Sequence, residues 1–254
     1  MPWEPRLVRR SKDRIKEFLC RRLHVEFNSI GLPVPLARRL ERGRPIVLLD
    51  VGAFEGWFTR VVSQYCGLTK CVMVEPIPHR AESLRRHFAL PQYEVFCCAV
   101  SDREGVVSFE TNAQEATSSM LPMLRDLDEV RGTMMECPPT ATFEVPTLPL
   151  DYISEQARLT NIDLLKIDVQ GAEHLVLDGA HDTLARTRLV WIEVSFRPLY
   201  SGSSTFAPLY ERFDALGFSL IDLEPGFRSR TGELLQADAL FVRRDATPTL
   251  DAVQ

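Results

Sequence analysis

The stretch IVLLDVGAFEG, residues 46–56, decides the fold of this 254-residue chain. Its first four residues are apolar without interruption, which is typical of a parallel strand buried on both faces of a sheet. Gly52 and Gly56 follow in a short loop, where glycine allows the sharp turn that joins a strand to a helix. A helical pattern then continues to about Tyr65. The stretch therefore predicts a strand–loop–helix unit of an α/β protein.

The rest of the chain continues this alternation. Further buried strands are predicted at residues 71–74, 93–100, 163–169 and 189–196, and helices at residues 79–89, 172–184 and 205–216. Two final strands, at 218–223 and 239–242, have no helix between them, so we expect an antiparallel hairpin at the edge of the sheet. The predicted fold class is α/β: a doubly wound, mostly parallel seven-stranded sheet with helices on both faces.

A less regular region separates the third and fourth of these strands. It contains a short hairpin strand at 106–109, a strand at 142–147 and a short helix at 150–157. Residues 112–141 show no clear period, and so long an irregular stretch is more often functional or mobile than part of the core. We expect this segment to be a lid over the acceptor site, with ordinary core packing as the alternative for its four methionines.

Charge divides the chain into parts. Residues 1–44 carry 12 Lys or Arg and 5 Asp or Glu, whereas the whole chain has a net charge of -5, which argues against a nucleic-acid binder. Helical spacing over residues 6–30 predicts an N-terminal helical cap, which either docks on an anionic surface or packs on the acidic body. We expect a basic cap at 1–44, which is also our candidate for self-association, one domain at 45–244, and a loose tail at 245–254.

Cysteine usage and the N-terminus indicate a compartment. The six cysteines form no CxxC pair, which excludes a recognisable zinc site or disulfide framework; they are Cys20, Cys66, Cys71, Cys97, Cys98 and Cys137. The N-terminus lacks the apolar stretch of a signal peptide, and no run approaches the length needed to span a bilayer. We therefore expect a cytoplasmic protein without a transmembrane segment.

In open α/β sheets, ligands bind beyond the carboxyl ends of the strands, so the residues that follow each strand are the candidate site. The loop after the first strand supplies five candidates for a nucleoside cofactor: Asp50, Gly52, Ala53, Glu55 and Gly56. Its glycines allow close backbone approach, the helix N-terminus attracts a carboxylate, and Asp50 or Glu55 is suited to an ammonium group. The alternative is a tight strand-to-helix turn without a ligand.

Two further strand ends fit the same cofactor. Glu75, followed by Pro76, lies 25 residues beyond Asp50, where a carboxylate accepts both hydroxyls of a ribose. Small apolar residues with a polar neighbour, which suit the face and edge of an adenine, follow the third strand: Ala99, Val100 and Ser101. A surface glutamate and a plain strand end are the respective alternatives.

Charged side chains also follow the fourth and fifth strands. An isolated buried charge is costly, so Lys166 is expected to pair with a carboxylate. Asp168 lies at the tip of its strand, facing the predicted cleft, and is a candidate both for binding the cofactor and for catalysis. Glu193 stands within the apolar run WIEVSF, where a carboxylate needs a partner or a chemical function.

Together these segments resemble the FkbM family of methyltransferases. The resemblance covers roughly residues 46–244 and rests on motifs that occur in the family's order, namely residues 50–53 with Gly56, 74–76, 99–102, 165–173, 179–180 and the strand containing Glu193. The most specific motif is the KIDVQGAE segment, residues 166–173. Family members usually carry Asn at position 54 and Glu at position 170, where this chain has Phe54 and Gln170.

The resemblance implies a class I methyltransferase that uses S-adenosylmethionine (SAM) to methylate a hydroxyl group of a sugar, polyketide or other secondary metabolite. Such a small-molecule acceptor loses its proton as the methyl group arrives, which requires a general base or a metal ion. Asp168 is the first candidate base, with Glu193 and His174 behind it. The sequence assigns no metal ligands, and Gln170 lacks the charge of a base.

Two other functions remain open. A nicotinamide-dependent (NAD) oxidoreductase shares the strand–glycine–helix start and the acidic residue after the second strand. The missing GxGxxG and the closing antiparallel pair argue against it. The other alternative is a non-catalytic protein of the same fold that binds a partner, because fold alone does not establish function.

Overall fold

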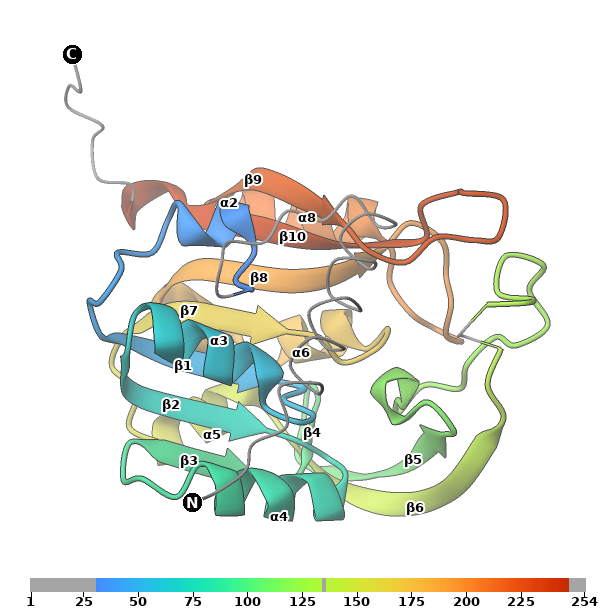
Figure 1. Ribbon diagram of the computed structural model, residues 1–254, viewed down its shortest axis with the longest axis horizontal. Coiled ribbons are helices and arrows are strands. Elements are labelled where there is room, and N and C mark those ends of the chain that lie inside the picture. Colours follow the sequence, from blue (N-terminus) through green and yellow to red (C-terminus); the bar gives the residue numbers. More distant parts are fainter. Residues whose placement is uncertain (1–30, 134–135, 247–254) are drawn as a thin grey trace, which may run out of the picture.

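The computed structural model describes residues 31–133 and 136–246. Its main sheet confirms the predicted fold class, with seven strands in the order β3-β2-β1-β7-β8-β10-β9 (Figure 1). The strands are β1 Ile46–Val51, β2 Leu68–Val74, β3 Tyr93–Phe96, β7 Ile162–Ile167, β8 Thr187–Ser195, β9 Phe218–Pro225 and β10 Gln236–Arg243. β10 pairs antiparallel with both β8 and β9, so the closing hairpin places the last strand inside the sheet.

Helices cover both faces of this sheet, as doubly wound folds require. One face packs against α2 (Val34–Ala37), α3 (Trp57–Tyr65) and α4 (Pro78–His87). The other packs against α5 (Leu150–Gln156), α6 (Glu173–Asp178), α7 (His181–Ala185) and α8 (Phe206–Ala215). The two sets lie in front of and behind the sheet in Figure 1.

The apolar runs of the sequence arise because central strands are buried on both faces. In β8, Val190 and Ile192 contact the α5–α8 layer, whereas Leu189 and Trp191 contact the α2–α4 layer. Glu193 therefore follows on the α2–α4 side of the sheet, at the carboxyl end of its strand. The alternation along the strand thus brings this carboxylate to the edge where ligands bind.

A second, three-stranded sheet corrects the prediction of one long third strand at 93–100. The chain leaves β3 at Phe96, bends at residues 97–98, and re-enters a different sheet as β4 (Ala99–Val100). There β4 pairs with β6 (Pro139–Leu148), which pairs antiparallel with β5 (Gly105–Asn112). The uninterrupted apolar run concealed the bend, because both sheets bury the residues on either side of it.

The predicted helix at 172–184 is also wrong, since the chain forms two short helices, α6 and α7. Gly179 separates them and lies against the loop that follows β4. A Cβ atom at this position would come within 2.3 Å of the Ser101 carbonyl oxygen. The helix therefore breaks where the backbone must approach a neighbouring loop more closely than any side chain allows.

The N-terminal cap and the tail are described only in part. The predicted helix at 6–30, and with it the proposed self-association surface, lies outside the described residues. Within residues 31–44 the structure contains α2, and the start of the tail forms a short 3-10 helix, η2 (Arg244–Ala246). None of the helices found in these described stretches is long and apolar enough to span a bilayer.

Phe213 offers a test of how α8 is held to the sheet. It is fully buried, with its ring stacked on Phe241 of β10 at 4.2 Å and edge-on to Phe218 of β9. We expect Phe213→Ala to lower the free energy of unfolding by about 3–5 kcal/mol, because it leaves a cavity, as measured by urea denaturation. Tyr210→Ala, at a 41% exposed position of the same helix, is the control with an expected cost of about 1 kcal/mol. Equal losses in the two variants would contradict this account.

Candidate functional site

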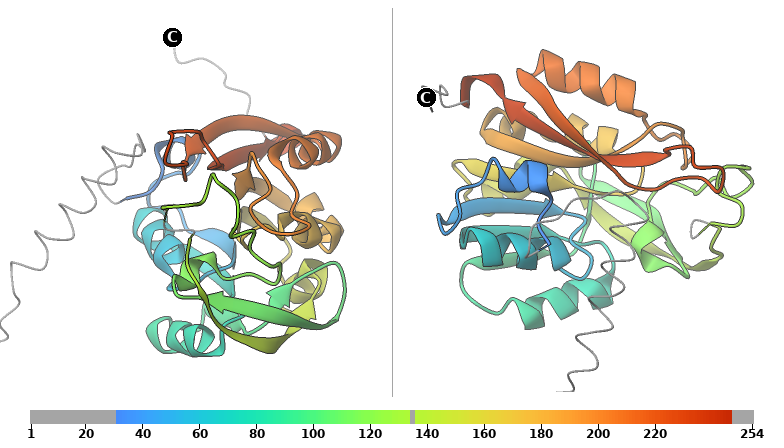
Figure 2. Two further views of the ribbon diagram at one scale, coloured as in Figure 1. Left: turned by 90° about the vertical axis from the view of Figure 1, so that its right-hand side faces the viewer. Right: turned by 45° about the horizontal axis from the view of Figure 1, so that its top comes forward.

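A pocket opens at the carboxyl ends of β1, β2 and β7. The space inside it is about 660 Å³ when the solvent-open volume at its mouth is included. The left view of Figure 2 looks onto this side, with β5, β6 and the segment between them lying in front of the main sheet. Its lining comprises Val51, Gly52, Phe54, Val74, Glu75, Pro76, Ile77, Cys98, Ala99, Val100, Phe109, Glu115, Ala116, Ser118, Met120, Asp168, Val169 and Gln170.

Gly52 sets the geometry of the loop after β1. Its φ of +76° is the left-handed conformation that glycine tolerates, and a Cβ atom there would lie 1.8 Å from the Asp168 carbonyl oxygen. The N–H groups of Gly52 and Ala53 both donate to the Val74 carbonyl oxygen. The loop is thereby pressed between the ends of β2 and β7, with Gly52 on the pocket and Ala53 in the core beneath it.

Glu75 lies on the pocket wall with only 3% of its surface exposed. One carboxylate oxygen accepts the Phe54 N–H at 2.8 Å, and the other accepts the Ile77 N–H at 2.9 Å. Burial raises the pKa of this carboxyl to about 7 against the lowering effect of those two N–H groups. Each oxygen keeps a second lone pair, so the carboxylate can still accept hydrogen bonds from a ligand.

Asp50 and Lys166 form the predicted buried pair behind the pocket wall. The Lys166 Nζ lies 3.6 Å from Asp50 Oδ1 and 3.5 Å from Asp168 Oδ2, and it donates to the Gly52 carbonyl oxygen at 2.6 Å. The Thr59 hydroxyl donates to the other Asp50 oxygen at 2.7 Å. Burial disfavours the charged lysine, but the two carboxylates outweigh it and raise the lysine pKa. Asp50 does not line the pocket, so a direct contact with a cofactor ammonium stays a prediction.

Asp168 and Glu193, two of the three candidate bases, are brought together by Gln170. The Gln170 Nε2 donates to Asp168 Oδ1 at 2.8 Å and to Glu193 Oε2 at 2.9 Å. Gln236 at the start of β10 donates to the same Glu193 oxygen at 2.8 Å. Asp168 lines the pocket, whereas Glu193 does not and reaches Asp168 only through Gln170.

The surroundings of this pair are acidic. In the register of β8 and β10, Asp238 stands directly opposite Glu193, and Glu173 of α6 lies nearby. Burial and the neighbouring carboxylate of Asp168 raise the pKa of Asp238 to about 7. Burial, with Asp168, Glu173 and Asp238 around it, raises the pKa of Glu193 well above its usual range. Lys166 is the cation that opposes these charges.

Three further predicted site residues, like Asp50, Ala53 and Glu193, do not line the pocket. Gly56 packs against α4, where a Cβ atom would lie 2.5 Å from the Phe88 ring. Ser101 is buried, with its hydroxyl donating to Asp102. His174 lies on α6, and its Nδ1 is buried without a hydrogen-bond partner among the described residues.

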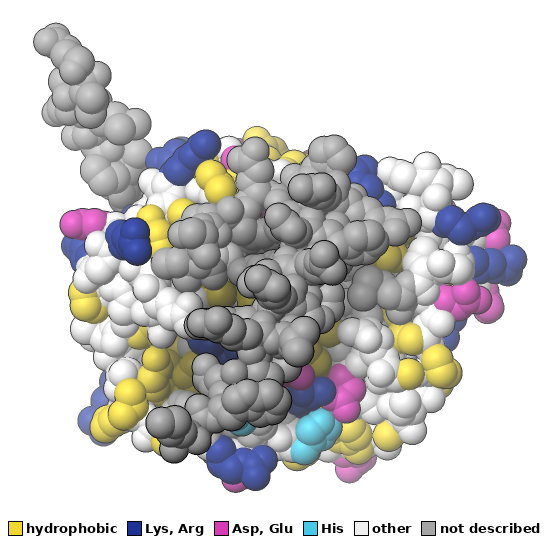
Figure 3. All heavy atoms as spheres, in the orientation of Figure 1, with side chains coloured by type: hydrophobic (Ala, Val, Ile, Leu, Met, Phe, Trp, Pro, Cys, Tyr) yellow, Lys and Arg dark blue, Asp and Glu magenta, His cyan; other side chains and the backbone are white. Residues whose placement is uncertain are grey.

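Glu55 also lies outside the lining residues and instead forms part of a surface ion-pair chain. Its carboxylate is 2.6 Å from Arg80, which also pairs with Glu115 at 2.6 Å and stacks over the Phe54 ring. This chain ties the loop after β1 to the short helix η1 (Glu115–Thr117) across the mouth of the pocket. Figure 3 shows basic and acidic side chains intermixed along the margin of one face of the molecule.

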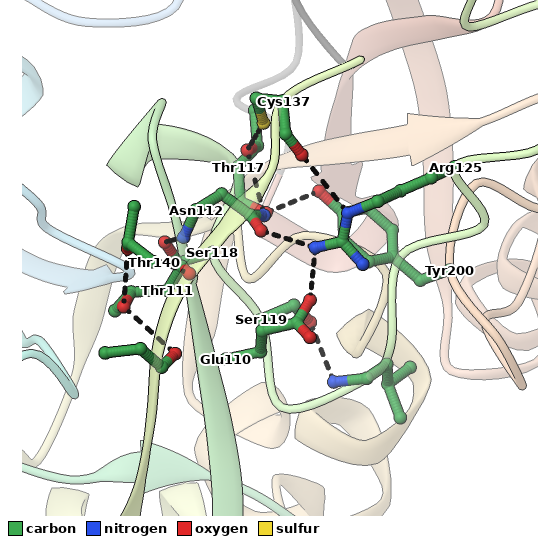
Figure 4. A network of polar contacts seen from close by, with 12 residues as sticks. Glu110, Thr111, Asn112, Thr117, Ser118, Ser119, Arg125, Cys137, Thr140 and Tyr200 are labelled. Atoms are coloured by element: carbon green, nitrogen blue, oxygen red, sulfur yellow. Dashed lines mark hydrogen bonds and ion pairs between the residues drawn. The ribbon is translucent and has the colours of Figure 1, made fainter.

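The irregular segment after β5 lies over the pocket, since Glu115, Ala116, Ser118 and Met120 all line it. It is anchored by Arg125, whose guanidinium bonds Glu110, the Asn112 side chain at 2.6 Å and the Cys137 carbonyl at 3.1 Å (Figure 4). Met123 packs with Leu199 and Tyr200, as its core alternative suggested, whereas Met120 faces the pocket. A role for this segment as a lid stays a prediction.

Sequence reasoning missed several residues of the site. The last strand was predicted to begin only at residue 239, so Gln236 and Asp238 were given no role, and Tyr200 and Arg125 carried no motif. Their only sequence signal is a polar side chain at an inward-facing position of a strand or beside a buried one. Among the residues the structure describes, no group of three or more acidic, histidine or cysteine side chains is arranged to hold a metal ion.

The order of the sheet, with its inserted antiparallel strand and a pocket at the carboxyl ends, defines a class I, Rossmann-like methyltransferase fold. The family model described as "Methyltransferase FkbM domain" matches residues 50–220. The chain belongs to the FkbM methyltransferase family, as the sequence motifs predicted.

Individual relatives extend this comparison. The chain is 28% identical over 233 residues to the 2-O-methyltransferase NoeI of Sinorhizobium fredii, covering 88% of this chain and 91% of that one. It is 30% identical over 179 residues to the AMB antimetabolite synthetase AmbE of Pseudomonas aeruginosa, covering 58% of this chain and 8% of that one. A crystal structure of the methyltransferase FkbM from Methylobacillus flagellatus matches with a TM-score of 0.48 at 13% identity, covering 78% of this chain and 43% of that one.

Glu173 tests the electrostatics of the site through the pH dependence of stability. Burial raises its pKa from 4.5 to about 7, so the folded protein holds a proton that the unfolded chain has already released between these pH values. Stability therefore falls as the pH rises through this interval. Glu173→Gln keeps an oxygen for the Val169 and Gly171 N–H groups but does not titrate.

We expect the unfolding free energy of Glu173→Gln, measured by urea denaturation from pH 4.5 to 8, to fall less steeply with pH than that of the wild type. The exposed Glu104→Gln should leave the slope unchanged. Identical slopes in wild type and Glu173→Gln would show that Glu173 is not protonated in the folded protein.

Proposed function

We propose that this protein is a SAM-dependent O-methyltransferase that acts on a hydroxyl group of a small molecule. The observation that carries the proposal is the pocket itself. It has a buried carboxylate at the end of one strand and, at the end of another, a carboxylate held in place by an ion pair and a hydrogen bond. Glu75 supplies the first and Asp168 the second, and both line the same cavity. Membership of the FkbM family supports this assignment.

The pocket suits the parts of SAM separately. Glu75 retains acceptor capacity on both oxygens and would hold the two ribose hydroxyls. Apolar side chains at the small sheet would cover the adenine, with Ala99 and Val100 behind it and Met120 from the segment above. Four N–H groups of the β1 loop already donate within the chain, so they are not free to hold the carboxylate of SAM, whereas the neighbouring acids would attract its amino group.

SAM supplies an activated methyl group, so the chain's own task is alignment, exclusion of water and removal of one proton. Asp168 is the candidate base, because it lines the pocket and its two oxygens are held by Lys166 and Gln170. As the acceptor oxygen forms its new bond to the methyl carbon, its proton would pass to the Asp168 carboxylate. Glu193 is placed to share that charge through Gln170.

The proposed class of methyl acceptor rests on the chemistry of the pocket and on a related protein. A hydroxylated acceptor, such as a sugar, a polyketide or another secondary metabolite, suits a floor of carboxylates and carboxamides, which both hydrogen-bond hydroxyl groups. The 2-O-methyltransferase relative supports O-methylation. A nicotinamide-dependent oxidoreductase and a non-catalytic binding protein are the functions against which this proposal is tested.

Calorimetry with SAM tests the cofactor. We expect micromolar binding of SAM and of its demethylated product, and no binding of NAD. Glu75→Gln should weaken SAM binding by about tenfold or more, because a charged acceptor of two hydroxyl hydrogen bonds is lost. Ala99→Phe, which fills the proposed adenine site, should abolish binding, and the exposed Glu82→Gln should not change it. NAD binding in place of SAM would overturn the proposal, and thermal unfolding would verify that each variant is folded.

Turnover of Asp168→Asn tests the base. With a panel of sugar and polyketide acceptors and SAM carrying a labelled methyl group, we expect the rate to fall by about 100-fold or more while SAM affinity changes only a few-fold. Glu193→Gln should cost less, and His174→Ala should retain turnover because His174 does not line the pocket. Loss of SAM binding in Asp168→Asn would instead make Asp168 a cofactor ligand.

A further inference from the structure

Gln170 makes an unusual set of contacts at the floor of the pocket. Its single Nε2 atom donates to Asp168 Oδ1 at 2.8 Å and to Glu193 Oε2 at 2.9 Å. The two acceptors come from the ends of adjacent strands, β7 and β8. Both hydrogens of one neutral carboxamide are therefore directed at carboxylates, and the two acids are joined through a group that carries no charge of its own.

The other end of this carboxamide contacts a buried tyrosine. The Tyr200 hydroxyl lies 2.9 Å from Gln170 Oε1, to which it donates, and is also 2.9 Å from the Thr117 carbonyl oxygen. A flipped carboxamide would direct Oε1 at two carboxylate oxygens, which offer it no hydrogen when charged. The acids therefore favour the orientation in which the donor faces them and Oε1 faces the Tyr200 hydroxyl.

The backbone conformation around Gln170 also helps to place its side chain between the two acids. Gln170 has a φ of +56°, a left-handed conformation that is costly for a residue with a side chain. Gly171 follows with a φ of +95°, and a Cβ atom there would lie 2.8 Å from the Tyr200 ring. The Ser119 hydroxyl donates to the Gln170 carbonyl oxygen at 2.8 Å. The segment over the pocket and the tyrosine thus hold the strained turn that carries the side chain between the acids.

Charge explains why a neutral donor matters at this position. The ionisable groups facing Glu193 are Asp168 and Lys166 from β7, Glu173 from α6, Asp238 from β10 and the hydroxyl of Tyr200. Lys166 is the cation among them, and its ammonium group forms ion pairs with Asp168 at 3.5 Å and with Asp50 at 3.6 Å.

Hydrogen bonds from carboxamides therefore supply the remaining support for the two acids. Gln236 gives one such bond to Glu193 at 2.8 Å, whereas Gln170 reaches both acids. This difference separates the two glutamines: Gln236 supports a single acid, and Gln170 couples the pair.

We propose that Gln170 is a positioning residue that holds the carboxylates of Asp168 and Glu193 in one hydrogen-bonded unit and thereby orients Asp168 for proton removal. The catalytic meaning rests on the proposed function, in which Asp168 is the base. The coupling itself is a property of the ligand-free chain and is measured there. A charged glutamate at this position would instead place a third carboxylate against two others, whereas the amide supports both acids without any cation besides Lys166.

Carboxyl-carbon NMR titration of the full chain, labelled at Asp and Glu, tests the coupling without any ligand. Asp168→Asn and Glu193→Gln assign the two signals. In Gln170→Met, which keeps the length of the side chain but removes the donor, we expect the titration midpoints of both Asp168 and Glu193 to rise by about one pH unit. Gln236→Met is the matched control and should raise the midpoint of Glu193 alone.

The outcomes decide between coupling and mere packing. Rises at both acids in Gln170→Met, with a rise only at Glu193 in Gln236→Met, support the proposal. An unmoved Asp168 midpoint in a folded Gln170→Met protein overturns it. If Gln170→Met does not fold, Tyr200→Phe keeps the glutamine but removes the hydroxyl that orients it, and unchanged midpoints in that variant would equally overturn the proposal.

The two proposals fail separately. Absence of SAM binding by the wild type would refute the methyltransferase function while leaving the ligand-free titrations intact. Normal SAM binding with unmoved midpoints would refute the coupling alone. Gln170→Glu gives a further check, because a third acid should raise the midpoints beyond those of Gln170→Met.

Discussion

The buried ammonium group of Lys166 holds the two central strands together at the end where the pocket forms. It lies within 3.6 Å of carboxylates from the ends of both β1 and β7 and donates to the carbonyl oxygen of Gly52. Breaking such a pair by removing one partner typically costs about 3–5 kcal/mol, because the other charge stays buried. The glycine loop, the pocket wall and the position of Asp168 all depend on this contact.

One lysine does not neutralise the acids gathered around it. Asp50, Asp168, Glu193 and Asp238 lie across four neighbouring strands at the same edge of the sheet, and burial dominates the raised pKa values of the last two. The raised pKa values and the hydrogen bonds from Gln170 and Gln236, rather than further cations, offset this excess of negative charge. Only Asp168 among these acids lines the pocket, and the others lie around it.

The second sheet gives the pocket its other wall. Because the chain bends out of the main sheet at residues 97–98, Ala99 and Val100 face the pocket, and the segment that follows β5 returns over it. Arg125 binds that segment to β5, and Tyr200 binds it to the turn that carries Gln170. The segment over the pocket and the acids at its floor are therefore joined by one hydrogen-bonded network.

Local pattern was sufficient for the strand–loop–helix start, the closing hairpin, the family and the pairing of Lys166, because each depends on hydrophobic period, on glycine or on the cost of a buried charge. It also placed Glu75 and Asp168 at strand ends, which the sheet brings to one pocket. Only the tertiary structure revealed the bend at residues 97–98 and the break at Gly179, since an apolar run does not show which sheet it enters. Only the tertiary structure gave Gln170 its partners, because Asp168, Glu193 and Tyr200 meet through strand register and a left-handed turn. Such contacts are decided by the packing of distant segments and leave no period in the sequence.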